Sequence, residues 1–183
     1  METLQERFAT LERRLFVENF LDEQRTIIPN FLFAYHGEQE AHVNQGVQKI
    51  LIKSKEHEKK IVEVNLFDVF TTLFAEELED VFILAESEGL EMLLDAVEPT
   101  LNDSDSLVEA FNNLSKDSDV VLLTGVGTAY PIIHTNGLLK RLATSGHSKP
   151  IIVFYPGTFN GTQLKLFDRY EVVEDEYQIY VIA

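Results

Sequence analysis

Five short runs of apolar and β-branched residues recur along the chain, with helical periodicity in most of the sequence between them. The runs cover residues 31–35, 61–66, 119–124, 150–155 and 177–182. Continuous apolar runs of this length are typical of strands buried in a parallel sheet. We therefore expect five strands at these positions, of which the run DVVLLT at 119–124 is the clearest.

The intervening segments carry apolar residues at helical spacing. In the first of them, residues 4–21, Leu4, Phe8, Leu11 and Leu15 alternate with charged residues, which predicts an amphipathic helix. Further helices are expected at 39–54, over 69–97 as two helices with a break near Glu79 or Gly89, from an N-cap within 102–106 to about 114, and at 131–142. Alternating strands and helices predict an α/β fold: a single domain over residues 1–183 with a mostly parallel five-stranded sheet and helices on both faces.

Composition narrows the classes of function. The 183 residues carry 15 Lys and Arg against 31 Asp and Glu, a net charge of −16, which disfavours nucleic acid and anionic membranes as direct partners. There is no cysteine, so no disulfide, thiolate zinc site or cysteine nucleophile is expected, in keeping with a cytoplasmic location. No run approaches the roughly 20 apolar residues of a membrane-spanning helix, and no signal peptide is evident.

The loop Thr124 to Pro131 (TGVGTAYP) follows the clearest strand, at the sheet edge where parallel folds bind ligands. Gly125 and Gly127 give it a phosphate-loop character, but it lacks the lysine of a Walker loop, and Tyr130 occupies the third position of the dinucleotide pattern. A tight strand-to-helix turn, with Pro131 near the first helical position, is the simpler interpretation. Anion binding by the loop stays open as the alternative.

A second loop, Tyr155 to Thr158 (YPGT), follows the fourth strand and is expected to form a type II turn, with a further reversal at 159–161. His36, Asp68 and His134 also follow strands and could form a metal or acid–base set, although surface or turn positions are the simpler interpretation. No catalytic, metal or cofactor motif is present. The candidate binding residues are therefore those of the two loops and the helix after the first: Thr124, Gly125, Gly127, Thr128, Tyr130, His134, Asn136, Tyr155, Gly157 and Thr158.

The segments VVLLTGVGTAYPIIHTNGLLKRL and KPIIVFYPGTFNGTQLKLF together resemble the BrxB family of bacteriophage exclusion (BREX) systems. The resemblance is strongest over residues 118–183. It implies a pathway rather than a reaction: such systems methylate host DNA and block phage DNA replication, and the family is encoded beside a PglZ-type phosphatase, an ATPase and a methyltransferase. The chain departs from the family pattern at His134 and Gln178, where the family usually carries arginines suited to anion binding.

Two functions are consistent with these observations. The first is a non-enzymatic interaction module without a cofactor, whose partners are other BREX components such as the PglZ-type phosphatase, the ATPase or the methyltransferase. The second is a nucleotide- or phosphate-binding domain that uses the loop Thr124 to Pro131. The missing catalytic motifs favour the first.

Overall fold

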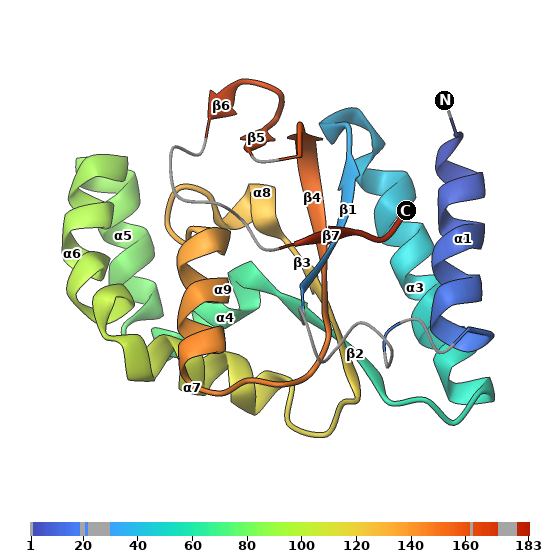
Figure 1. Ribbon diagram of the computed structural model, residues 1–183. Coiled ribbons are helices and arrows are strands. Elements are labelled where there is room, and N and C mark those ends of the chain that lie inside the picture. The colour runs from blue at the N-terminus through green and yellow to red at the C-terminus, as the bar shows by residue number, and fades with distance from the viewer. Residues whose placement is uncertain (1, 19–20, 22–29, 162, 172–178) are drawn as a thin grey trace.

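The structure is a computed structural model that describes residues 2–18, 21, 30–161, 163–171 and 179–183. Five parallel strands form its central sheet in the order β2-β3-β4-β1-β7 (Figure 1). Their bounds are β1 Asn30–Tyr35, β2 Ile61–Asn65, β3 Val120–Thr124, β4 Ile151–Phe159 and β7 Tyr180–Val181. The predicted fold class is confirmed, and the last strand is shorter than predicted, with residues 177–178 outside the described ranges.

Alternate residues of each strand point to opposite faces, so the sheet separates two apolar cores. In β1, Phe31 and Phe33 belong to one core and Leu32 to the other, and all three are fully buried. The helices cover both faces (Figure 1). Burial on both faces explains why the strands read as continuous apolar runs.

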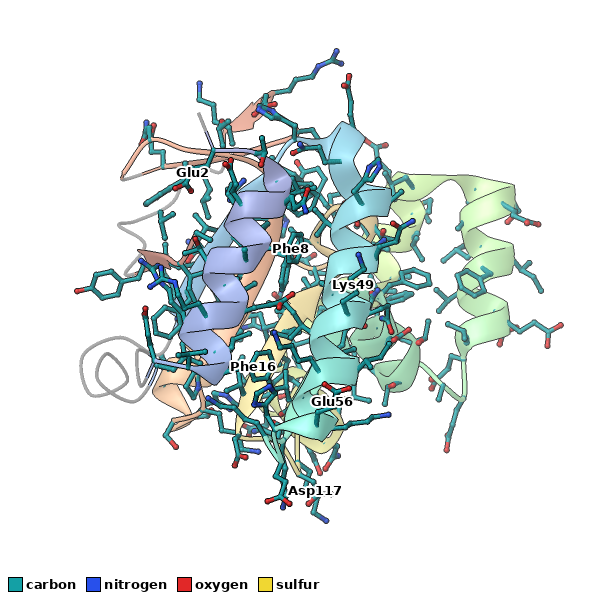
Figure 2. All side chains as sticks on the ribbon, turned by 90° about the vertical axis from the view of Figure 1, so that its right-hand side faces the viewer. Glu2, Phe8, Phe16, Lys49, Glu56 and Asp117 are labelled. Carbon is teal, nitrogen blue, oxygen red and sulfur yellow. The ribbon has the colours of Figure 1, made fainter. Side chains whose placement is uncertain are left out.

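The helices α1 (Leu4–Phe16) and α3 (Glu40–Glu56) cover one face and lie side by side, with Phe8 between them (Figure 2). The short η1 helix, Gly37–Gln39, leads into α3. The backbone of Gly46 lies so close to the Phe8 ring that a Cβ there would overlap it. Arg7 donates from Nη2 to the backbone oxygens of Ala34 (2.6 Å) and Ala183 (2.7 Å), which ties α1 to β1 and to the chain after β7. The predicted first helix ends earlier than residue 21.

On the other side of the sheet lie α4 (Leu66–Leu73), α5 (Leu78–Glu88), α6 (Leu90–Asn102), α7 (Ser104–Leu114) and α9 (Thr135–Thr144). The two predicted helices over 69–97 are three, because the chain breaks both at Gly89 and in a turn at 74–77, close to Glu79. Asp103 caps α7 by accepting from the Asp105 N–H, as its position within 102–106 predicts. Within the described ranges, no helix is both long enough and apolar enough to cross a membrane.

The chain after β4 adds a small antiparallel extension. β5 (Leu164–Leu166) pairs with the end of β4, and β6 (Tyr170–Glu171) pairs with β5. Leu164 and Leu166 are buried in the core, while Phe167 is 39% exposed. The acidic composition of 171–176 predicts a solvated connection before the last strand, and this stretch lies, beyond Glu171, outside the described residues.

Candidate functional site

The loop after β3 is closed by the side chain of Asn65. Gly125 adopts the left-handed conformation (φ 71°) and begins the four-residue helix α8 (Val126–Ala129). A Cβ at Gly125 would overlap Asn65 Oδ1, the same oxygen that accepts from the Phe67 N–H at 2.9 Å and caps α4. A glycine is therefore required at position 125, because the Asn65 side chain fills the space that any other side chain would need.

The second glycine of the loop is covered by an aromatic ring. A Cβ at Gly127 would lie 2.6 Å from Phe167 Cζ and 3.2 Å from Pro156 Cγ. Phe167 and Asp168 form the turn between β5 and β6, both with positive φ (51° and 59°). His36 Nδ1 lies 3.3 Å from Asp168 Oδ2, so this turn also reaches the end of β1. The β5–β6 turn thus packs over the loop Thr124 to Pro131, the candidate anion-binding loop.

The helix predicted at 131–142 begins later, which corrects the placement of Pro131. Pro131 follows a cis peptide bond after Tyr130, and α9 starts at Thr135 with His134 as its N-cap. The backbone N–H groups of Ile132 and Ile133 donate to the Ala129 carbonyl, and this tight turn separates α8 from α9. The prediction was wrong because the sequence does not reveal that Val126–Ala129 already forms a helical turn.

The expected type II turn at Tyr155 to Thr158 is also wrong, because β4 continues through it to Phe159. Tyr155 and Pro156 pair with β1, and Gly157 and Thr158 then pair with β5. A glycine is needed at position 157 for packing rather than for a turn, because a Cβ there would overlap the Lys165 carbonyl oxygen. The reversal expected at 159–161 does occur, where Asn160 Oδ1 accepts from the Gln163 N–H at 2.8 Å.

Two buried polar groups near the start of α9 have no hydrogen-bond partner. They are the Tyr155 hydroxyl and the Asn136 side-chain nitrogen, in residues that are 2% and 4% exposed. Burial, together with Tyr130, raises the pKa of Tyr155, so its hydroxyl stays a neutral donor. Tyr155, Tyr130 and His134 line a pocket of only about 20 Å³, which is about the size of one water molecule.

The candidate residues are therefore only partly brought together. Tyr130 and His134 meet edge to face, 5.7 Å between ring centroids, and share the small pocket with Tyr155. Thr128 and Thr158 are exposed, while Thr124 is buried and donates to Glu63 Oε1 at 2.7 Å. In the part of the chain that the structure describes, no three His, Asp or Glu side chains are grouped to hold a metal ion, so His36, Asp68 and His134 form no such set.

The sequence places Asn65 at a strand end but does not predict its role beside Gly125, and Glu63 and Phe167 were not predicted at this edge. Asn65 had a readable signal, because an asparagine directly after a strand and before a helical pattern is a typical N-cap. Glu63, which also accepts from Gln48 Nε2 at 2.9 Å, had no signal beyond being polar within a strand. Phe167 had none either, since a bulky Phe rarely takes the positive φ angle that it has in this turn.

Together these features define a parallel α/β domain covered on both faces, whose carboxyl edge is largely filled by its own side chains. The family model of "BREX protein BrxB" matches residues 62–180, well over half of the chain, and the chain therefore belongs to the BrxB family. This confirms the resemblance seen in the two loop segments and makes the chain a component of a BREX phage-defence system.

Two curated relatives carry the same description. BREX protein BrxB of Bacillus cereus (strain H3081.97) is 27% identical over 153 residues, which cover 80% of this chain and 79% of the relative. BREX protein BrxB of Escherichia coli O9:H4 (strain HS) is 26% identical over 168 residues, which cover 88% and 82%. No solved structure matches the chain significantly.

Proposed function

We propose that this chain is a non-enzymatic assembly component of its BREX system, and that it acts by binding another defence protein such as the PglZ-type phosphatase or the ATPase. One observation carries the proposal beyond family membership. At the carboxyl edge, where parallel α/β folds ordinarily bind substrates, Asn65 fills the space beside Gly125 and Phe167 covers Gly127. An edge packed with its own side chains suits a protein that works through its outer surface.

Electrostatics supports a protein partner. The net charge of −16 repels phosphate backbones and attracts basic protein surfaces, which speeds association with a basic partner at low salt. The cytoplasm, where the other defence proteins meet phage DNA, is the location that this function requires.

Copurification tests the proposal. The full chain, tagged and expressed together with the neighbouring defence genes, is expected to retain the PglZ-type phosphatase, the ATPase or the methyltransferase at both low and moderate salt. The tag alone serves as the control. If none of the three is retained at either salt concentration, the proposal is wrong.

The nucleotide- or phosphate-binding alternative has one observation in its favour, the two unpartnered donors Tyr155 and Asn136 near the start of α9. Calorimetry with ATP, GTP and inorganic phosphate at millimolar concentration separates the two functions. Binding heat that disappears in Tyr155→Phe would support the alternative, and no heat with any of these ligands would reject it.

A further inference from the structure

The helices α5 and α6 form an antiparallel hairpin on the outside of the domain. Figure 1 shows them side by side at one edge of the molecule, with α4 and α9 between them and the strands. Gly89, with φ 87°, joins the two helices, and the hairpin rests on the domain through Val81, Leu93 and Val97, which are buried. The opposite side of each helix faces outward.

Four large apolar side chains on this hairpin are exposed. Phe82 is 44% exposed, Ile83 55%, Leu90 51% and Met92 49%. Of the nine large apolar residues that are exposed in the described part of the chain, these four lie within eleven consecutive positions. Single exposed apolar residues are common, but a local group that includes Phe and Met is typical of a protein-binding surface.

The charges around these apolar residues all have one sign. No Lys or Arg occurs between Lys60 and Lys116, so every charged residue in this stretch is acidic. Those on the hairpin and its entry turn are Glu76, Glu77, Glu79, Asp80, Glu86, Glu88, Glu91, Asp95 and Glu98. All nine are exposed, so they share this surface with the exposed apolar side chains and form its acidic rim.

That combination selects one kind of occupant. Nucleic acid and anionic lipid are repelled by the rim, and a symmetric dimer through the hairpin would place two acidic rims against each other. A protein surface with Lys and Arg around an apolar pocket complements both the charge and the exposed Phe82 and Met92.

We propose that the outer face of the α5–α6 hairpin is the docking surface for such a basic protein surface, carried by another component of the same defence system. The inference rests on the proposed assembly function and adds to it the surface used and the chemistry of the partner. The apolar side chains anchor the contact, and the acidic rim steers it.

The apolar anchor is tested with the full chain and with each purified candidate: the PglZ-type phosphatase, the ATPase and the methyltransferase. A variant with Phe82→Gln and Met92→Gln is expected to bind its partner at least about tenfold more weakly, because exposed anchors of this size are typical hot spots. Ile52→Gln is the matched control, since Ile52 is 63% exposed on α3, on the other face of the sheet. It is expected to bind within about twofold of the parent chain.

The rim is tested by removing equal charge at two places. Glu86→Gln with Glu91→Gln is expected to weaken binding about fivefold at low salt, with the difference shrinking near 0.5 M salt, on the order expected for screened rim charges. Glu38→Gln with Glu56→Gln, on exposed residues away from the hairpin, is the control and leaves affinity unchanged; Glu56 is labelled in Figure 2.

The outcomes separate this inference from the proposed function. If a defence protein binds the parent chain but both hairpin variants bind it equally well, the docking surface is wrong and the assembly function stands. Binding that does not depend on salt would contradict a basic partner. If instead the parent chain forms a dimer and the hairpin variants are monomers, the surface binds a second copy of this chain and the proposed partner is wrong. If the parent chain binds none of the three proteins, both proposals fail.

Discussion

The side chain of Asn65 occupies the space into which any side chain at position 125 would project. Its Oδ1 caps α4 through the Phe67 N–H, and its Cγ lies 2.6 Å from where a Cβ at Gly125 would stand. The Asn65 side chain can therefore take this capping position only because position 125 is a glycine. This contact fixes the start of α4 and the loop after β3 at the same time.

Gly125→Ala is expected to destabilise the protein by about 2 kcal/mol or more, because alanine pays the left-handed penalty of roughly 1–2 kcal/mol and also displaces Asn65. The free energy of unfolding, measured by chemical denaturation, checks this. Two glycines serve as controls because a Cβ at either meets no atom within 4 Å. Gly146→Ala, at φ 83°, is expected to cost about 1 kcal/mol, and Gly137→Ala, inside α9, to stabilise by about 0.5–1 kcal/mol. Equal losses at 125 and 146 would contradict the role of Asn65.

The strands were predictable because burial on both faces leaves a continuous apolar run in the sequence. Val120–Thr124 and Asn30–Tyr35 each differ from the predicted strand by one residue at most. The cap at Asp103 was predictable for a different, local reason: its side chain accepts a hydrogen bond from its own backbone two residues on.

The features that the sequence did not predict depend on contacts between segments far apart in the chain. Pro156 and Gly157 are turn residues by local preference, yet pairing with β1 and then with β5 keeps them in a strand. Phe167 packs over Gly127 although forty residues separate them, and nothing in either local sequence indicates it. The loop after β3 was therefore predictable as a loop at the carboxyl edge of the sheet, but the side chains that pack against it could not be predicted from the local sequence.

The contact between Gly127 and Phe167 is measurable as a coupling energy. Gly127→Ala is expected to cost about 1 kcal/mol, a modest value because the Phe167 ring is 39% exposed and can move aside. In a Phe167→Ala background the same change is expected to cost clearly less, because only the 3.2 Å contact with Pro156 Cγ remains, and the difference is the coupling energy of a double-mutant cycle. Strictly additive effects would show that the ring does not press on the loop.

Tyr155→Phe is expected to leave stability unchanged or to raise it by up to about 1 kcal/mol, because it removes a buried hydroxyl that has no partner. Tyr35→Phe is the matched control, since the Tyr35 hydroxyl donates to the Glu40 carboxylate and its loss is expected to cost about 1.5–3 kcal/mol. Denaturant midpoints of the two variants provide the comparison. A clear loss of stability in Tyr155→Phe would mean that its hydroxyl is satisfied in solution.

His147 is expected to make stability depend on pH below neutrality. Its Nδ1 lies 3.2 Å from Asn112 Oδ1, so that nitrogen carries the proton, and its Nε2 is buried without a partner. Burial, and then the nearby Lys149, lower the pKa of His147 in the folded protein. The unfolded chain, with a pKa of about 6.5, binds the proton first, so the free energy of unfolding falls as pH drops through 6.5 towards the folded pKa.

His147→Asn removes this component, because asparagine can still donate to Asn112 but does not titrate. The difference in unfolding free energy between the parent chain and His147→Asn is therefore expected to change steadily between pH 7.5 and pH 5.5, in favour of the variant at the acid end. An equal slope in the parent chain and in His147→Asn would show that His147 protonates as readily in the folded chain as in the unfolded one.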